Sequence, residues 1–586
     1  MITVATGPAA YVPEARVFDD DHFGYNYTGF RALSRFDSQM DGSHVGMITW
    51  PGGSLAENAT DKYGLEYDGL WNGNGAAGNL PELMALAKES GATLSVVLPT
   101  LRYAGDLDTM RAHVHDFMAD LLGGAYGPMP DRMVLEIGSE FYSTFRGTAN
   151  PAQLYGNIAD NMIREIHTCL TDPSINALGA DLDIAIQGGR NLAEDAMLRD
   201  ALEDDTLRNV DMVIHHRFSV QATGVDKSAD QIHDILDAWE HDAEAVGGER
   251  PELFLGTYNV ASCTRGEALG EYLKTLEGQN HMTYQPAVDL AGRTDADFEE
   301  FYQHRLERYD YGAEHPRVLL EMMSEYGAEG MGAAGTYGTD LQHAGRLSYT
   351  DAQGAPVKFV GQEMLDMMSE SIDGTHLLKI SLTNDAGDDV WAYGFENDDK
   401  LVLFLSASDK VPGKLALDID GLGSTYHSVW ADSLTAKVPD DWMARFGITD
   451  NPLVDETPES RTYALGIRSE VTPTFDQGEL SVTMDEPHEM IRLSFAKTAA
   501  GAEEIAGYAE GTGHDLHEAV AAHPELMQFG ALDDMPMVDF QPLDDAQDDD
   551  QDHDLHADLE AAGMEAGGMA LGLAALVLPL LALAGM

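Results

Sequence analysis

The stretch Val134-Leu-Glu-Ile-Gly-Ser-Glu-Phe-Tyr142 reads as a short buried strand that ends in a carboxylate. Gly138 lets the backbone turn closely after the strand, and Glu140 follows that turn. Enzymes built on parallel barrels hold their catalytic acids at strand ends. Phe141 and Tyr142 give a partly dry, aromatic setting that suits a general acid. We predict that Glu140 is such an acid; a helix cap or a solvated carboxylate is the alternative.

Apolar strands and helical segments alternate on both sides of this stretch. The strand-like segments are Val45–Ser54, Val210–His216 and Leu253–Asn259, and the helical segments include Leu80–Ser90 and Tyr155–His167. Such alternation predicts a parallel sheet with right-handed crossovers. The span from about residue 24 to about residue 374 has the length of one (β/α)8 barrel. We assign residues 20–380 to it.

Four motifs carry a family resemblance. They are the Trp-Pro-Gly-Gly turn in Thr49–Ser54, the segment Glu136–Glu140, the strand Asp211–His216 and the strand end Thr257–Asn259. In this order they resemble the clan A retaining glycoside hydrolases, especially the arabinofuranosidase, β-xylosidase and heparanase-like families. The resemblance implies a TIM barrel, Glu140 as acid/base, and a polysaccharide or oligosaccharide as partner.

The chain departs from the family pattern where the chemistry should be. Thr49 stands where the family has arginine, Ser139 where it has asparagine, and Thr257 at the nucleophile position. Retaining hydrolysis needs two carboxyl groups about 5–5.5 Å apart. A threonine hydroxyl without a base cannot replace one of them. Glu252 starts the same strand, so we expect it at the opposite end of the barrel.

Two other carboxylates are candidates for the missing group. Asp340 follows the apolar segment Gly332–Tyr337, and Glu57 follows the Pro-Gly-Gly turn, so both are predicted on the catalytic face. Either could act as a base for water in an inverting geometry, with carboxylates about 6.5–9.5 Å apart. Each could equally be an ordinary loop carboxylate of a very acidic chain.

Paired histidines and several aromatic and amide side chains are predicted at the barrel mouth. His215 and His216 point to opposite sides of their strand, so only one faces the mouth. The resemblance implies that a histidine here helps to hold substrate; a structural histidine is the alternative. The other candidates for a sugar-binding lining are Trp50, Ser139, Thr257, Tyr258, Asn259 and Tyr337. The aromatic residues could instead simply fill the top of the barrel. No ligand set at metal-site spacing accompanies the histidines, so no metal or other cofactor is predicted.

The composition excludes some classes of partner. The chain has 586 residues, with 34 Lys and Arg against 101 Asp and Glu, which gives a net charge of −67. Such a field repels nucleic acid and anionic membranes. It suits a protein that stays soluble in salty surroundings, such as outside a marine or halophilic bacterium. Cys169 and Cys263 make no disulfide framework, and whether they pair stays open.

Short segments with β-type alternation follow the barrel, from His376 to Phe495, separated by turns rich in Asp and Gly. This spacing predicts an antiparallel β-sandwich over residues 381–498, to which residues 1–19 could add a strand. Accessory sandwiches commonly follow barrels of this clan, so the resemblance implies one too.

The composition of the chain changes twice near its end, first to an acidic segment and then to an apolar one. From Thr498 to Met586 there is no Lys or Arg, and 19 residues are Asp or Glu. We predict an acidic, largely disordered linker over residues 499–565; calcium binding there is conceivable, but the spacing matches no EF-hand. Residues 566–586 are apolar and carry no charge. This arrangement resembles the C-terminal signal of a type I secretion substrate; a membrane or surface-sorting anchor and a contact with a partner chain are alternatives.

Three functions fit these observations. The first is an exported, extracellular or cell-surface glycoside hydrolase with Glu140 as acid/base and an unusual or missing second carboxylate. The second is a non-catalytic descendant that binds glycan in the same cleft. The third is a surface structural protein that keeps the barrel as a scaffold. The sugar, the linkage and the oligomeric state stay open.

Overall fold

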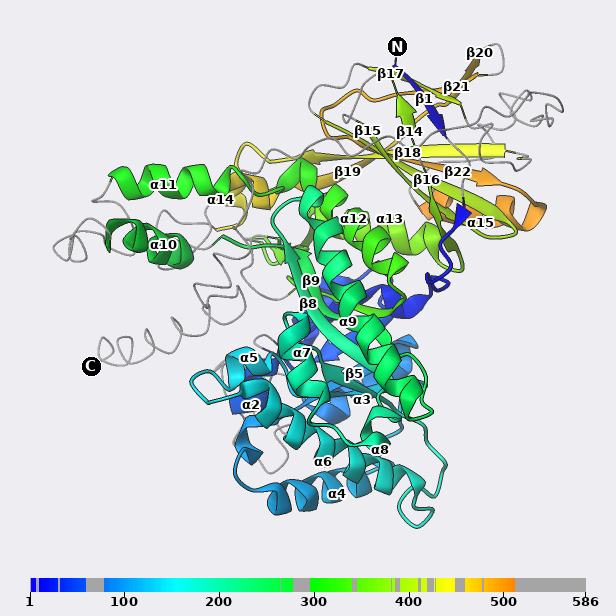
Figure 1. The fold of residues 1–586 in the computed structure, drawn as a ribbon. Helices are drawn as coiled ribbons and strands as arrows, with labels where there is room; N and C mark the ends of the chain where they lie inside the picture. Colours follow the sequence, from blue (N-terminus) through cyan, green and yellow to red (C-terminus); the bar gives the residue numbers. More distant parts are fainter. Residues whose placement is uncertain are drawn as a thin grey trace.

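The structure is a computed structural model, and it describes two regions of the chain: a barrel and a sandwich (Figure 1). The described residues are 2–511 except 7–9, 30–31, 59–77, 264, 278–295, 340–344, 352, 381, 385–389, 409–412, 419–425, 427, 448–458 and 477–478. The predicted apolar segment 566–586 and the predicted linker beyond residue 511 lie outside them. None of the helices in the described part of the chain has the length and apolarity needed to cross a membrane.

Eight parallel strands close into a barrel, which confirms the predicted fold class. In chain order they are β3 (Gly24–Asn26), β4 (Met47–Trp50), β5 (Thr93–Leu98), β6 (Met133–Ile137), β7 (Asp183–Gln187), β8 (Met212–Ser219), β9 (Glu252–Val260) and β10 (Met331–Thr336). β10 pairs with both β9 and β3, so the sheet has no edge. The carboxyl ends of all eight strands therefore share one rim.

Helices surround the strands as sequence periodicity predicts. They are α1 (Leu33–Met40), α2 (Gly53–Asn58), α3 (Leu80–Ser90), α4 (Leu107–Leu122), α5 (Phe141–Thr144), α6 (Pro151–Thr171), α7 (Leu192–Arg199), α8 (Asp204–Leu207), α9 (Val225–Ala245), α10 (Arg265–Glu277), α11 (Ala296–Leu306), α12 (His315–Ala328) and α13 (Val360–Ile372). The bounds of α3 match the predicted segment because its ends are encoded locally: Asn79 and Glu82 form a capping box, and Gly91 ends the helix in the left-handed conformation.

Inward-facing apolar side chains form an interior layer, to which β8 gives two successive inward positions and each of five other strands gives one. The layer consists of Met47, Val134, Ala185, Met212, Ile214, Phe254 and Ala333, which come from six of the strands. Because side chains alternate along a strand, the residues two positions further along these strands also point inward, closer to the carboxyl rim. This alternation decides which polar residues meet at the barrel mouth.

The rest of the described chain forms a sandwich of two sheets, as predicted. One sheet has the order β14-β1-β17-β21-β20 and the other has the order β19-β18-β22-β16-β15-β13-β2. The bounds are β1 (Ile2–Thr6), β2 (Ala10–Tyr11), β13 (His376–Lys379), β14 (Leu382–Asn384), β15 (Val390–Glu396), β16 (Lys400–Ala407), β17 (Lys414–Asp418), β18 (Ser428–Lys437), β19 (Leu465–Glu470), β20 (Thr474–Asp476), β21 (Glu479–Thr483) and β22 (Met490–Ala496). The N-terminal segment thus supplies one strand to each sheet.

Smaller elements complete the picture. The hairpin of β11 (Ser348–Thr350) and β12 (Pro356–Lys358) joins β10 to α13, and α14 (Trp442–Arg445) lies between β18 and β19. Helix α15 (Ala499–Gly511) packs Ile505 against Trp430 of β18. Regular structure therefore continues into the first 13 residues of the segment that the sequence assigned to the linker.

The seven-stranded sheet is apolar on both faces. In β16, Leu401, Leu403 and Leu405 point into the sandwich core. The alternate residues Val402 and Phe404 belong to the large core that includes the barrel helices. One sheet thus serves two cores, and it has no solvent-facing side along this strand.

A buried ion-pair network holds α13 against the same sheet. The guanidinium of Arg492, on β22, is fully buried and donates to both carboxylate oxygens of Asp432 at 2.9 Å. It also donates to the carbonyl of Met367 at 2.9 Å and to Glu370 at 3.3 Å, both on α13. This network ties β22 and β18 of the sandwich to α13 of the barrel.

Candidate active site

Glu140 stands at the carboxyl rim of the barrel, just past the end of β6. Its backbone is left-handed, with φ 42° and ψ 57°, and Gly138 before it has φ 65°. A non-glycine residue at positive φ carries a strain of about 1–3 kcal/mol, and such residues cluster at functional sites. The Glu140 amide donates to Oε1 of Gln187, at the end of β7, at 3.3 Å. Neighbouring strands therefore hold this turn in place.

His216 reaches the carboxyl group of Glu140 from β8. It lies two residues beyond Ile214 of the inward layer, so its ring points into the barrel mouth. Nδ1 of His216 lies 3.0 Å from Oε1 of Glu140. The two side chains are 14% and 18% exposed, which leaves the pair accessible and partly desolvated. The structure thus brings together two residues that lie 76 positions apart in the sequence.

His215 faces the other way, as the alternation requires. It is buried behind the strand, where a Cβ on Gly188 would meet its ring at 2.7 Å. Burial lowers the pKa of His215 well below its usual value, with the nearby Arg217 acting in the same direction. A buried imidazole packed against the turn after β7 is a structural residue, and of the two histidines His216 is the one at the mouth.

The position of Thr257 follows from a β-bulge in β9. Ile214 pairs with Phe254, but His216 pairs with Thr257, so β9 carries one extra residue here. Thr257 therefore points inward beside His216. Its hydroxyl donates to the Gly256 carbonyl at 2.8 Å and accepts from the amide of Asn26, on β3, at 3.4 Å. The threonine is held in a neutral hydrogen-bonded setting.

Strand β9 offers no carboxylate at the catalytic rim. Its sequence from Leu253 to Val260 contains no acidic residue. Glu252 begins the strand at the opposite end of the barrel and forms an ion pair with Arg16. The expectation that Glu252 is remote from the site therefore holds.

Glu57, one of the two candidates for the second carboxylate, is fully engaged by backbone and hydroxyl donors. Its oxygens accept from the Thr100 amide at 2.9 Å, the Thr100 hydroxyl at 2.7 Å and the Leu101 amide at 2.7 Å. Burial raises its pKa, against the lowering effect of these hydrogen bonds. Thr100 in turn packs against Gly138, where a Cβ would meet it at 2.8 Å. This geometry suits a residue that supports the Glu140 turn. The other candidate, Asp340, lies outside the described residues.

Glu136 is a carboxyl group of the barrel interior that the sequence analysis did not single out. It points inward on β6, two residues beyond Val134 of the interior layer, and accepts a 2.5 Å hydrogen bond from the Ser95 hydroxyl of β5. Burial raises its pKa to about 7, although the Ser95 hydrogen bond and the nearby His216 oppose this. The alternation of β6 was the signal that could have revealed it.

The predicted sugar-binding lining is split between exposed and buried positions. Ser139 and Tyr337 are partly exposed, and the Tyr337 ring packs edge-on against Phe218. Trp50 and Tyr258 are buried, at 0% and 1% exposed, so their rings belong to the packed core.

Asn259 and Ser139 have defined packing roles. Asn259 is fully buried: its amide donates to two backbone carbonyls, and its oxygen lies 2.7 Å from Nε2 of His315. Ser139 packs against the Pro-Gly-Gly turn so closely that a Cβ on Gly53 would lie 2.2 Å from its side chain. The glycine of the turn is thus required by its contact with the residue that precedes Glu140.

A cavity of about 760 Å³ opens at the other end of the barrel. Its lining is mostly polar and includes Arg132, Asp183, Asp211 and Glu252 from the starts of β6 to β9. In TIM-barrel enzymes this end contributes stability, whereas chemistry takes place at the carboxyl rim. The cavity is therefore separate from the Glu140 site.

Solved structures of α-L-arabinofuranosidases are similar to this chain. The family 51 enzyme AbfB from Bifidobacterium longum gives a TM-score of 0.53 at 11% identity, over 84% of this chain and 99% of that one. The Thermotoga maritima enzyme, in complex with arabinose, gives 0.50 at 12% identity over 84% and 99%. A further arabinofuranosidase gives 0.50 at 11% identity over 84% and 100%.

The fold is that of the clan A glycoside hydrolases. This confirms the resemblance drawn from the four motifs, and it extends over the sandwich as well as the barrel. No protein-family model and no curated protein matches the sequence. At 11% identity to AbfB the fold alone is shared, so the activity of this chain has to be argued from its own residues.

Proposed function

We propose that the chain is an exported, glycoside hydrolase-like protein that acts on a polysaccharide, with Glu140 as the general acid. The observation that carries the proposal is the 3.0 Å contact between Oε1 of Glu140 and Nδ1 of His216 at the carboxyl rim. A proton donor at this rim meets a sugar that enters the barrel mouth.

His216 acts as a positioning residue in this scheme. With the proton on Nδ1, the imidazole donates to Oε1 of Glu140 and fixes the plane of the carboxyl group. Oε2 is then the oxygen that carries the acidic proton and delivers it to the glycosidic oxygen. Such a donor contributes about 10²–10⁴-fold to a rate.

Attack on the anomeric carbon requires a nucleophile, or a base that activates water. Thr257 stands at the clan A nucleophile position, and its hydroxyl already donates to Gly256. A covalent intermediate on β9 is therefore disfavoured, and an inverting attack by water is the route we propose. Asp340 is the proposed base, since Glu57 already accepts hydrogen bonds from Thr100 and Leu101.

A second candidate function is glycan binding without turnover. The specific observation in its favour is the hydrogen bond from Asn26 to Thr257, which fills the nucleophile position with a neutral pair. A neutral pair of this kind could hold sugar hydroxyls but could not attack an anomeric carbon.

The test is a hydrolysis screen on plant, algal and bacterial glycans, beside direct binding measurements. Wild type is compared with Glu140→Gln, Asp340→Asn and the control Glu300→Gln, which alters an exposed carboxylate of α11. Turnover that both site variants abolish and the control keeps supports the inverting hydrolase. Binding without turnover supports the second candidate. Turnover that survives Glu140→Gln contradicts the acid assignment.

Export is a separate part of the proposal. It rests on the uncharged residues 566–586 after the acidic segment. Cells that produce the full chain and cells that produce a chain ending at residue 565 are fractionated. Secretion of the full chain alone supports the proposal, and equal retention of both contradicts it.

A further inference from the structure

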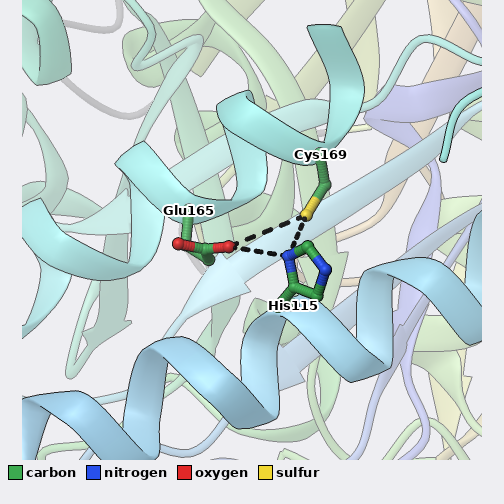
Figure 2. Close-up of side chains that lie close together, drawn as sticks. All are labelled: His115, Glu165 and Cys169. Carbon is green, nitrogen blue, oxygen red and sulfur yellow. Dashed lines mark hydrogen bonds and ion pairs between the residues drawn. The ribbon is translucent and has the colours of Figure 1, made fainter. Parts of the chain in front are cut away.

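Three side chains with metal-binding atoms meet on the outside of the barrel, far from the Glu140 site. His115 lies on α4, and Glu165 and Cys169 lie one turn apart on α6, which packs alongside α4 (Figure 2). Nδ1 of His115 lies 2.9 Å from Oε1 of Glu165 and 3.5 Å from Sγ of Cys169. Sγ lies 4.0 Å from the same carboxylate oxygen. Three donors of three chemical types thus converge on one point.

These separations match one face of a coordination tetrahedron. Zinc takes nitrogen and oxygen ligands at about 2.0–2.2 Å and thiolate at about 2.3 Å, which puts neighbouring ligand atoms about 3.3–3.8 Å apart. The measured separations of 2.9, 3.5 and 4.0 Å bracket that range. Small side-chain rotations would bring all three atoms to a common ion. Within the described residues this is the group of His, Cys and carboxylate side chains that could hold one.

We propose that His115, Glu165 and Cys169 form a binding site for a divalent cation of the zinc class. The thiolate and imidazole select zinc, cobalt and similar ions over calcium and magnesium, which prefer oxygen ligands. His115 is 47% exposed and gives the ion a path from solvent, while Glu165 is 19% exposed. Water takes the fourth position.

Charge around the site favours a cation. The carboxylates of Glu165 and Asp172 both act electrostatically on the Cys169 side chain. Their negative charge attracts a divalent ion. On binding, the S–H bond of Cys169 breaks, a metal–sulfur bond forms, and one proton passes to the buffer.

The site would clamp the two helices on either side of β6. Helix α4 precedes that strand and α6 follows it, and β6 ends at the turn that carries Glu140. A bound ion stabilises the folded state without touching the barrel mouth. The inference therefore stands independently of the proposed glycan activity.

The experiment uses the full chain, stripped of metal by a chelator, and the ions Zn²⁺ and Co²⁺ alone. Calorimetry measures zinc binding, and a thiolate-to-cobalt charge-transfer band in the near ultraviolet reports contact with sulfur. The acidic C-terminal segment holds histidines but no cysteine, so this band separates the proposed site from cation binding there. Cys263→Ser, at the other cysteine, is the matched control.

The expected result is a cobalt–thiolate band in wild type and Cys263→Ser that is absent from Cys169→Ser. His115→Ala, at a half-exposed position, should weaken zinc binding at least about 10-fold and remove most of the band. If Cys169→Ser does not fold, the His115→Ala variant still tests the proposed site. A wild-type protein without the band, or a band that His115→Ala leaves unchanged, overturns the proposal.

Discussion

The hydroxyl of Ser95 donates a 2.5 Å hydrogen bond to Oε1 of Glu136 inside the barrel, near His216. A carboxyl group fully enclosed by strands is costly to ionise. The hydrogen bond and the histidine reduce that cost only in part, since the pKa of Glu136 still rises to about 7.

The Glu136 carboxyl should make stability depend on pH. Its pKa is about 7 in the folded chain, against about 4.3 in an unfolded one, so its contribution is full below about pH 4 and is lost as the pH rises through 7. The loss is on the order of 3 kcal/mol. Glu136→Gln cannot ionise, so its free energy of unfolding should fall less than that of wild type between about pH 5 and pH 8. Urea titrations at both pH values measure this, and parallel losses in the two proteins would contradict it.

The left-handed backbone of Glu140 predicts a trade-off between stability and function. Asn adopts this conformation more readily than Glu, so Glu140→Asn should keep or raise the free energy of unfolding, by up to about 1 kcal/mol. The same variant should lose any turnover. Thermal unfolding of Glu140→Asn and Glu140→Ala tests this prediction, because alanine does not relieve the backbone strain at this position. A lower midpoint for Asn than for Ala would mean that the strain is not relieved.

Glu57 is expected to matter for stability. Glu57→Ala leaves the amides of Thr100 and Leu101 and the Thr100 hydroxyl without their acceptor, which costs about 1–3 kcal/mol. Glu57→Gln keeps one acceptor oxygen and should lose less. Chemical denaturation compares the two. If the two variants lose turnover while both retain wild-type stability, Glu57 is catalytic instead.

The buried ion pair between Arg492 and Asp432 predicts that substitutions at the two residues have non-additive effects on the free energy of unfolding. Asp432→Ala leaves the buried guanidinium with Glu370 as its remaining carboxylate on α13, and it should cost about 3 kcal/mol or more. The double variant Asp432→Ala/Arg492→Met removes the buried charge too and should recover part of that loss. A double-mutant cycle in urea measures the coupling, and additive losses would show that the pair does not interact.

Installing a carboxylate at position 257 tests the strand register. Thr257 faces inward beside His216 through the bulge in β9. Thr257→Glu should therefore create a carboxyl near Glu140 and give retaining hydrolysis of activated aryl glycosides, which Glu140→Gln in the same background removes. Folded protein with no such activity, on substrates that fit the site, would argue against the register.

Much of the fold could be predicted because its signals are local. Apolar strands alternating with helical segments and the order of the four motifs were enough to give the barrel, the sandwich and the rim position of Glu140. The choice between His215 and His216 needed the interior layer, which fixes the inward side of β8. Glu57 was predicted as a loop or catalytic carboxylate, but its donors lie 43 and 44 positions away. No spacing rule could supply them.

The convergence of His115 with Cys169 was equally hidden. Their separation of 54 positions spans two helices and a strand. Only the packing of α4 on α6 brings the imidazole to the thiol. Ligands separated by that distance along the chain show no metal-site spacing, so no metal site was predicted from the sequence.

Because β16 is buried on both faces, the barrel and the sandwich cannot be expressed as separate stable fragments. A barrel expressed without residues beyond 380 would expose helices that normally pack against Val402 and Phe404. An isolated sandwich would present the same sheet, bare, to solvent. Neither region is expected to fold independently, so the isolated fragments should aggregate. In the intact chain, the barrel and the sandwich should unfold in a single thermal transition.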